Sequence, residues 1–242
     1  MIYGDILDIN SLIKAFKNAD NVYHLAGIVT IMPGDKSLIR KINFEGTKNV
    51  IKACIECNIR RLIYVSSIHA LKEPPEGTII DENMPFDPKN RRGEYDRTKA
   101  LASIEVLKSN GNGIESIVVC PTGVIGPYDF RGSLITKTIV DFAKGKMKIT
   151  INGVYDFVDV RDVAEGIILA AKKGKSGEKY ILSGERVSMD YMMKILSEIT
   201  NVKQPRFKIP IRLPKFIGVL SPMYYKLFNK TPRFTSYSIN IL

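Results

Sequence analysis

The sequence predicts an α/β fold in which a parallel sheet is covered by helices. Short apolar segments with strand character alternate along the chain with segments whose apolar residues recur at helical spacing. Such alternation is typical of a doubly wound parallel sheet with both faces covered. The length of 242 residues, with 45% hydrophobic content, suits one large domain and a smaller lobe.

The expected elements follow in chain order. The first part of the chain should contain a helix at 10–18, a strand at 21–26, a helix at 36–57, a strand at 61–66, a helix at 95–110, a strand at 115–120 and a helix at 133–145. After these, 148–151 and 157–160 should form a short strand pair, followed by a helix at 161–172, a strand at 179–182 and a helix at 189–199.

The apolar patterning argues for a cytoplasmic protein. The longest apolar stretches, such as 114–119 and 166–171, are far shorter than a bilayer span. Asp5 and Asp8 interrupt the N-terminal segment, and no basic flank precedes it, so the segment does not have the pattern of a signal peptide.

The three cysteines, an odd number, suit reduced thiols. Cys54 and Cys57 form a C-x-x-C spacing, but they lie within a helical pattern with no second pair or histidine at ligand spacing. Helix packing explains the pair better than zinc binding or redox chemistry, so no metal is expected.

The net charge of +11 raises the question of an anionic partner. From Lys203 onward there are eight Lys or Arg residues and no Asp or Glu, interleaved with aromatic residues. The apolar residues between Phe216 and Leu227 recur at helical spacing, which favours packing onto the smaller lobe. We therefore expect neither a nucleic-acid nor a membrane partner.

A tyrosine and a lysine lie four residues apart, at Tyr95 and Lys99, where a loop leads into a helix. Residues at i and i+4 share one helix face, so the Lys99 ammonium can lie near the Tyr95 hydroxyl and favour its phenolate form. The positive end of the helix dipole acts in the same direction. The pair is therefore a candidate for proton transfer.

A serine pair ends the buried strand that precedes this helix. Ser66 and Ser67 follow that strand directly, and the carboxyl ends of parallel strands form the edge where ligands bind in open α/β sheets. A hydroxyl there can donate to a substrate carbonyl while Tyr95 delivers or removes a proton. The alternative is that both serines only cap the loop after the strand.

With these residues in view, the chain resembles the extended short-chain dehydrogenase/reductase family, also called NAD-dependent epimerase/dehydratase, along nearly its whole length. The motifs that carry the resemblance are Gly4-Asp5-Ile6, His24-Leu25-Ala26-Gly27, Asn43 with Gly46-Thr47 and Asn49, Val65-Ser66-Ser67, Tyr95 through Lys99, Pro121 through Pro127, and Phe157 through Ala164. The phrases Thr98-Lys99-Ala100 and Pro121 through Pro127 are most similar to the dihydroflavonol-reductase and hydroxysteroid-dehydrogenase branch.

The resemblance implies a Rossmann-like sheet with a small mixed substrate lobe. Residues 1–147 would form a partial NAD(P)-binding domain, and residues 148–242 mostly the substrate lobe, with 157–184 returning to the Rossmann core. The implied cofactor is NAD or NADP, and the implied partner is a small-molecule substrate. The loop at 72–92, rich in proline and charge, should cover the site.

The resemblance also implies residue roles. Tyr95 would be the general acid/base, Lys99 would tune it and bind the nicotinamide ribose, and Ser67, or Ser66 in its place, would polarise the carbonyl. Residues expected along the cofactor are Asp5, Ile6, Leu25, Ala26, Gly27, Asn43, Ser66, Tyr95, Lys99, Pro121, Thr122 and Val124.

Three further positions are less directly tied to the site. Cys120 stands where the family commonly has arginine, so any contact of that arginine is in doubt. His24 is expected to be a hydrogen-bonded strand histidine, and His69 to contact either the substrate or the loop.

One expected family feature is absent from the sequence. The family opens with a strand, a Gly-x-x-Gly-x-x-Gly turn and a helix that holds the cofactor pyrophosphate, and no such turn occurs in these 242 residues. The pair Gly111 and Gly113 follows a helix and lacks a third glycine. The expectation is a chain without the family's first strands, truncated at its N-terminus and also short at its C-terminus.

Three functions are compatible with these residues. The first is an NAD(P)-dependent oxidoreductase acting on a ketone or secondary alcohol through Ser67, Tyr95 and Lys99. The second is a nucleotide-sugar epimerase or dehydratase, which would use the same tyrosine, lysine and cofactor. The third is an inactive, truncated fragment. By the family resemblance, the full-length form is expected to be a homodimer joined through the helices at 36–57 and 95–110.

Overall fold

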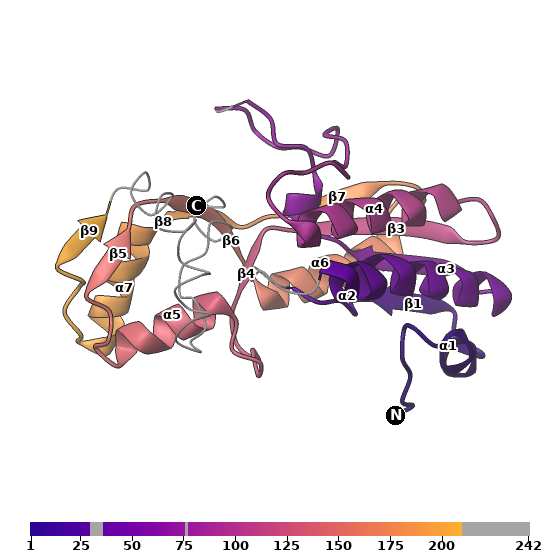
Figure 1. Ribbon diagram of the computed structural model, residues 1–242, viewed down its shortest axis with the longest axis horizontal. Helices are drawn as coiled ribbons and strands as arrows, with labels where there is room; N and C mark the ends of the chain where they lie inside the picture. The colour runs from indigo at the N-terminus through magenta and orange to yellow at the C-terminus, as the bar shows by residue number, and fades with distance from the viewer. Residues whose placement is uncertain (30–35, 76, 210–242) are drawn as a thin grey trace. The chain divides into compact units, whose positions relative to one another are not determined.

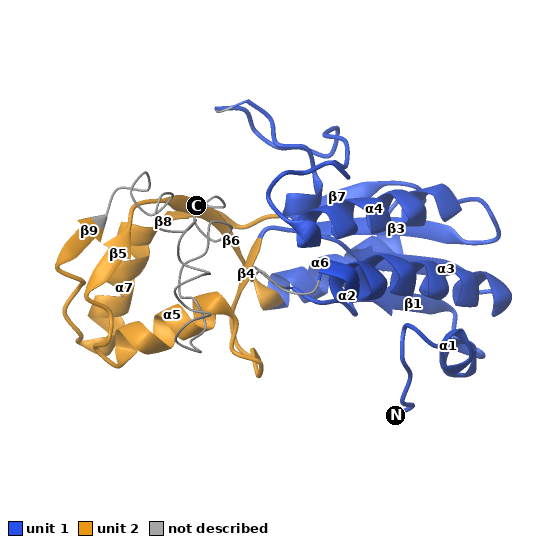
Figure 2. Cartoon of the chain, viewed as in Figure 1, with its two compact units in different colours: residues 1–30, 34–122, 161–182 blue, residues 31–33, 123–160, 183–242 orange. Residues whose placement is uncertain are grey.

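The computed structural model describes residues 1–29, 36–75 and 77–209. The chain forms two compact units (Figure 2). Unit 1 comprises residues 1–30, 34–122 and 161–182, and unit 2 comprises residues 31–33, 123–160 and 183–242. The division thus falls after residue 122, whereas the sequence placed it after 147.

Unit 1 is built on a parallel four-stranded sheet, which confirms the predicted α/β fold. Its strands are β1 (Asn21–His24), β2 (Arg61–Val65), β3 (Glu115–Pro121) and β7 (Lys179–Leu182), in the order β1-β2-β3-β7. The helices run alongside the strands in two layers (Figure 1).

Alternate strand residues face the two helical layers. Val22, Leu62, Tyr64, Val118 and Cys120 share one core with the helices α1 (Ile9–Phe16), α3 (Gly46–Glu56) and α4 (Glu94–Ser109).

The opposite face packs on α6 (Val160–Lys173). A Cβ atom added at Gly174, just beyond this helix, would lie 2.9 Å from the Ile117 side chain. Arg61 Nη1 donates to the carbonyl oxygens of Ala171 (2.7 Å) and Gly174 (3.3 Å), so it caps the end of α6. Both contacts hold the helix against the sheet.

The loop at 72–92 lies along the outer edge of β7. The Glu82 carboxylate accepts a hydrogen bond from the Ile181 backbone N–H at 2.9 Å, and Leu71 forms an antiparallel bridge with Phe86. Strand β1 pairs only with β2 among the described residues, and Tyr23 on it is 43% exposed. One sheet edge is therefore covered by the loop, while the other has no strand neighbour in the described part of the chain.

The described residues of unit 2 form two small sheets. One contains β4 (Gly123–Ile125), β6 (Val154–Asp159) and β8 (Glu185–Ser188), and the other pairs β5 (Ile149–Ile151) with β9 (Phe207–Ile209). Its helices are α5 (Leu134–Ala143) and α7 (Met189–Thr200), whose side chains Phe142, Met192 and Met193 form a small core.

Two predictions about these elements are wrong, one on strand pairing and one on the continuity of a helix. The strands expected at 148–151 and 157–160 do not pair with each other, because β6 is flanked by β4 and β8, and β5 pairs with β9 instead. The single helix expected at 36–57 is divided into α2 (Lys36–Arg40), a π-helical turn (Lys41–Glu45) and α3. Asn43 lies in the π turn.

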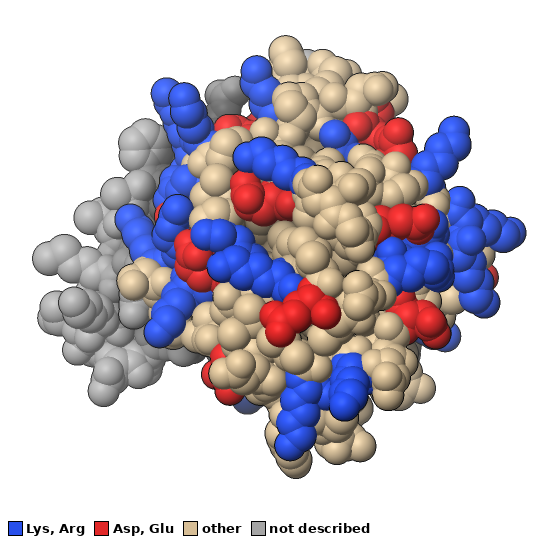
Figure 3. All heavy atoms as spheres, turned by 90° about the vertical axis from the view of Figure 1, so that its right-hand side faces the viewer, with Lys and Arg blue, Asp and Glu red and all other residues tan. Residues whose placement is uncertain are grey.

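The described residues contain no helix with the length and apolar character needed to cross a bilayer. Over the same residues, no group of three His, Cys, Asp or Glu side chains is placed to hold a metal ion. Cys54 is fully buried in the core, and the Cys57 thiol lies 3.5 Å from the Ile13 carbonyl oxygen, as helix packing predicts. On the face in Figure 3, basic and acidic side chains are interspersed.

Candidate active site

Lys99 is a buried lysine at the carboxyl end of the sheet. Helix α4 begins at Glu94, so Lys99 lies in its second turn and its side chain extends toward the end of β2. Its Nζ donates to the Val65 carbonyl oxygen at 2.7 Å and lies 4.7 Å from the centre of the Tyr64 ring. The residue is only 5% exposed. An ammonium group is thus held in place by a strand-end carbonyl and an aromatic face.

Burial changes the protonation of this lysine. Desolvation lowers the pKa of Lys99 from 10.5 to about 8, because the charged form loses hydration. At neutral pH the ammonium form still predominates. The site therefore holds a positive charge that is close to its titration point.

Gly27 lies directly beside this charge. A Cβ atom added at Gly27 would be 3.1 Å from Asn43 Oδ1 and 3.7 Å from Lys99 Nζ. The absence of a side chain leaves a backbone cradle next to the ammonium group, into which a ligand can come close.

Asn43 closes the other side of this cradle. Its Oδ1 accepts from the Ile28 N–H at 2.8 Å, and its Nδ2 lies 3.0 Å from the Ile28 carbonyl oxygen and 3.3 Å from Thr98 Oγ1. The π-helical turn therefore coincides with the residue that joins the segment after β1 to α4. Insertions of this kind often mark functional sites.

The two serines after β2 occupy different environments. Ser66 Oγ lies 2.7 Å from Ser103 Oγ, and Ser103 donates its own proton to the Lys99 carbonyl oxygen at 2.8 Å, so Ser66 is the donor toward α4. Ser67 Oγ accepts from the His69 N–H at 3.2 Å, and as a hydroxyl it also carries a proton that it can donate. The capping role that the sequence left open for Ser67 is therefore present, and it is compatible with donation to a substrate.

Tyr95 is the second residue of α4 and is 8% exposed. It shares a helix face with Lys99 four residues later. The loop at 72–92 is anchored close by, because Arg97 Nη1 donates to the Asn90 carbonyl oxygen at 2.9 Å. Arg92 also lies 3.1 Å from His69 Nδ1 and forms an ion pair with Glu73. His69 thus has a contact to the loop.

A chain of buried hydrogen bonds connects His24 through Thr47 to Asn43. His24 Nε2 lies 2.9 Å from Thr47 Oγ1, and Thr47 donates to the Asn43 carbonyl oxygen at 2.8 Å, so His24 must be the donor in the first bond. Burial, and then the charge of Lys99, lower the pKa of His24 to about 3. His24 is therefore a neutral, hydrogen-bonded strand residue, as expected. No role was predicted for Thr47 from the sequence, although it belongs to the Gly46-Thr47 motif of the family resemblance.

The remaining predicted cofactor residues are more scattered. Asp5 is exposed and its carboxylate accepts from the Leu7 N–H, while Ile6 packs against Gly46 and accepts from the Asn49 side chain through its carbonyl oxygen. Leu25 and Ala26 are exposed beyond the end of β1.

The predicted residues after β3 fall on both sides of the unit boundary. Pro121 ends β3 and Thr122 follows it, both beside Leu182 in unit 1, whereas Val124 lies in β4 of unit 2. Cys120, in the arginine position, is fully buried, and desolvation raises the pKa of its thiol to about 12. It therefore belongs to the core.

Comparison with known proteins identifies the relatives of this chain. The NAD dependent epimerase/dehydratase family matches residues 1–183. Sterol demethylase protein B of Methylococcus capsulatus is 35% identical over 242 residues, which cover 99% of this chain and 74% of that protein. The 3beta-hydroxysteroid-dehydrogenase/decarboxylase isoform 1 of Arabidopsis thaliana is 30% identical over 261 residues, and the chain spans 58% of its length.

A solved structure agrees with this relationship. The crystal structure of gox2253 superposes with a TM-score of 0.82 at 31% sequence identity, over 98% of this chain and 72% of that protein. The chain therefore belongs to the NAD dependent epimerase/dehydratase family of extended short-chain dehydrogenases/reductases, whose members are NAD(P)-dependent oxidoreductases, epimerases and dehydratases that act on small molecules.

Proposed function

We propose that the whole protein is an NAD(P)-dependent oxidoreductase that interconverts a ketone and a secondary alcohol. The observation that carries the proposal is the buried Lys99 ammonium, held 2.7 Å from the Val65 carbonyl oxygen beside the side-chain-free backbone of Gly27. A buried, perturbed lysine in such a cradle needs an anionic or hydroxyl-bearing ligand to justify its desolvation. A nicotinamide ribose and a tyrosine oxygen together meet that need.

The cradle fits a nicotinamide cofactor. Gly27 leaves space for a ligand, and Lys99 offers donors toward ribose hydroxyls. Leu25, Ala26, Pro121 and Thr122 would lie along the cofactor, and Asp5 and Ile6 would flank its adenine. When bound, the cofactor supplies or accepts the hydride.

The chain's own residues then handle the proton. Tyr95 gives a proton to the carbonyl oxygen during reduction and removes it from the alcohol during oxidation. Lys99 stabilises the phenolate that remains, because an ammonium on the same helix face lowers the energy of that anion. Ser67, which keeps a proton to donate, orients the substrate oxygen. Ser66 and Asn43 position Lys99 and α4 rather than the substrate.

We further propose that the substrate is a hydroxysteroid or sterol. This proposal is supported by two relatives with sterol and 3beta-hydroxysteroid names, at 35% and 30% identity. A nucleotide-sugar substrate is the alternative, since the family also contains epimerases and dehydratases.

A panel assay separates these functions. The whole protein is incubated with NAD⁺ or NADP⁺ and either a 3-hydroxysteroid or a nucleotide sugar, and reduced nicotinamide is followed by absorbance. We expect net reduction of the cofactor with the steroid alone. Conversion of the nucleotide sugar without net cofactor reduction would instead support an epimerase. No turnover of either substrate class with either cofactor would contradict both proposed activities.

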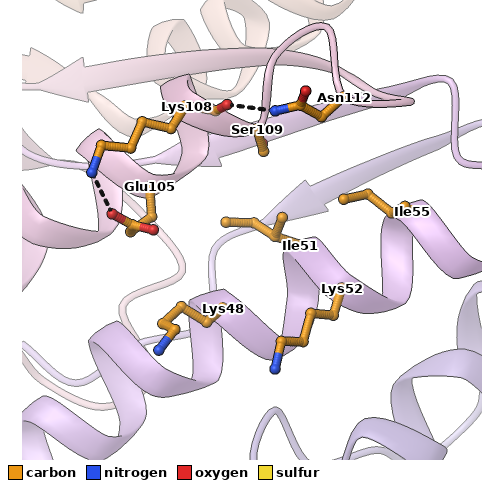
Figure 4. A pocket seen from close by; sticks show the side chains of 8 residues that line it. All are labelled: Lys48, Ile51, Lys52, Ile55, Glu105, Lys108, Ser109 and Asn112. Atoms are coloured by element: carbon orange, nitrogen blue, oxygen red, sulfur yellow. Dashed lines mark hydrogen bonds and ion pairs between the residues drawn. The ribbon is translucent and has the colours of Figure 1, made fainter.

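We also propose that the whole protein is a homodimer joined through α3 and α4. A groove lies between these helices, lined by Lys48, Ile51, Lys52 and Ile55 from α3 and by Glu105, Lys108, Ser109 and Asn112 from α4 and the turn after it (Figure 4). Ile55 is 39% exposed at its rim, so an apolar side chain is available for a partner helix. Sedimentation should show a dimer that Ile55→Lys weakens. A monomer at every concentration would contradict this assembly.

A further inference from the structure

Tyr64, on β2, is a second tyrosine beside Lys99. The Lys99 ammonium lies over its ring face, 4.7 Å from the ring centre, where a cation is attracted to the electron-rich face of an aromatic ring. Tyr64 is 1% exposed and Lys99 is 5% exposed, so water screens this attraction little. The two residues therefore form a buried cation–π pair next to the backbone cradle at Gly27.

The hydroxyl of Tyr64 takes no part in this contact. Its oxygen is buried and, within the described residues, makes no hydrogen bond of normal geometry. The Thr47 hydroxyl, which faces it, is engaged with His24 and with the Asn43 carbonyl oxygen. Burial, and then the nearby Tyr95, raise the pKa of Tyr64 well above that of an ordinary tyrosine. Tyr64 therefore stays a neutral phenol and meets the ammonium group with its ring face.

Among the described residues, no carboxylate acts on Lys99 in place of this ring. The titratable side chains that face Lys99 are His24 from β1, Tyr64 from β2 and Cys120 from β3, with Tyr95 on α4 itself. His24 and Cys120 are neutral at pH 7, because burial lowers the pKa of the histidine to about 3 and raises that of the thiol to about 12. Desolvation thus opposes the ammonium form, while the ring and one backbone carbonyl oxygen support it.

The sheet fixes the position of the ring. Tyr64 is paired with His24 in the register of β1 and β2, and the centres of their rings lie 5.2 Å apart. The next residue of β2, Val65, supplies the carbonyl oxygen that accepts from Lys99 Nζ at 2.7 Å. Two consecutive residues of one strand therefore hold the ammonium group, one through its side chain and the other through its backbone. The contribution of the side chain can be changed while that of the backbone is kept.

We propose that Tyr64 is a positioning residue of the site, whose ring face, and not its hydroxyl, keeps Lys99 in the ammonium form beside the Gly27 cradle. The two tyrosines near Lys99 then have separate roles. Tyr95 exchanges a proton through its oxygen, whereas Tyr64 acts through the charge distribution of its ring. The role of Tyr95 in this division rests on the proposed function. The action of Tyr64 on Lys99 can be measured without turnover.

The pKa of Lys99 in the whole protein measures the contribution of the ring. It is followed by NMR of protein labelled with carbon-13 at the lysine Cε, and Lys99→Met identifies the signal. Tyr64→Phe keeps the ring and should leave the pKa of Lys99 near the wild-type value. Tyr64→Leu should lower it by about one pH unit or more, as expected for loss of a desolvated cation–π contact. Ile63→Ala opens the core on the opposite face of the same strand and should leave the pKa of Lys99 unchanged.

The pH dependence of cofactor binding separates this inference from the proposed function. In Tyr64→Leu the affinity for NADH or NADPH should decline as the pH rises above about 7, instead of above about 8, because the ammonium form is lost earlier. Tyr64→Phe should follow wild type. If cofactor affinity is independent of pH in all three proteins while the pKa of Lys99 changes as expected, the proposed contact of Lys99 with the ribose fails and the role of Tyr64 stands.

Fluorinated phenylalanines at position 64 keep the packing and change the charge of the ring face. Fluorine withdraws electron density, so the pKa of Lys99 should fall stepwise from phenylalanine to monofluorophenylalanine to trifluorophenylalanine. This series tests the proposal even if Tyr64→Leu does not fold. The proposal is overturned if the pKa of Lys99 does not fall along the series. A pKa that falls as far in Tyr64→Phe as in Tyr64→Leu would assign the effect to the hydroxyl and would also overturn it.

Discussion

Replacing Lys99 with methionine should change how the stability of the protein depends on pH. Burial lowers the pKa of Lys99 from 10.5 to about 8, so between these values the unfolded chain binds more protons than the folded chain. At about 1.4 kcal/mol per pKa unit, the buried ammonium costs about 3 kcal/mol below pH 8, and this cost disappears as the pH rises to 10.5. Lys99 is only 5% exposed, so solvent screening reduces this cost little.

The assay compares wild type with Lys99→Met by denaturant unfolding at several pH values from 7 to 10. The free energy of unfolding of wild type, relative to the variant, should rise by about 2 to 3 kcal/mol over this range. Loss of the hydrogen bond to Val65 affects the variant equally at every pH, so it does not obscure the trend. Lys172→Met, at an exposed position on α6, is the control for removing a lysine that is not buried, measured over the same pH range. A stability difference between wild type and Lys99→Met that stays constant over this pH range would contradict the lowered pKa of the buried Lys99.

Three other changes test separate parts of the structure. Burial lowers the pKa of His24 to about 3 and of His69 to about 4, so each histidine should cost about 2 kcal/mol of stability as the pH falls from 7 to 5. In urea unfolding, His24→Gln should therefore lose about half as much stability over this pH range as wild type does. Equal losses would argue against a buried, neutral His24. Gly184→Ala should destabilise unit 2 by more than about 2 kcal/mol, since a Cβ there would meet the Phe157 carbonyl oxygen, and an unchanged Tm would contradict this packing. Tyr128→Asn should stabilise the protein by about 1 kcal/mol in thermal unfolding, because Tyr128 has φ +70° and asparagine tolerates a positive φ; destabilisation would contradict backbone strain at this residue.

The sheet of unit 1 could be predicted because its strands are locally distinct. The segments around β2 and β3 are short, apolar and bounded by loops, and such strands pair in parallel when helices separate them. The helix that contains Tyr95 and Lys99 was likewise predicted, and the structure places both residues in α4, where positions i and i+4 share one face.

The partners of the short strands could not be predicted. Strand β4 lies within the motif from Pro121 to Pro127, in which only Pro121, Thr122 and Val124 were predicted to lie along the cofactor. Its pairing with β6 is a long-range contact that leaves no local signal in the sequence.

The hydrogen bonds of Asn43 beside the candidate site also could not be predicted from the sequence. Asn43, in the π-helical turn at Lys41–Glu45, forms hydrogen bonds with the Ile28 backbone and with Thr98, which lie far from it in the chain. The spacing of Asn43 and Thr47, four residues apart, was the only local sign that the two act together.

The most direct test of the central claim is the turnover number of Tyr95→Phe in the whole protein, measured with the cofactor and substrate class that the panel assay identifies. The variant should lose most of the rate while its cofactor dissociation constant stays close to that of wild type, because only the proton donor is removed. Lys99→Met should lose both, since we propose that this side chain also binds the ribose. Turnover of Tyr95→Phe near the wild-type value would contradict the assignment of Tyr95 as the acid/base.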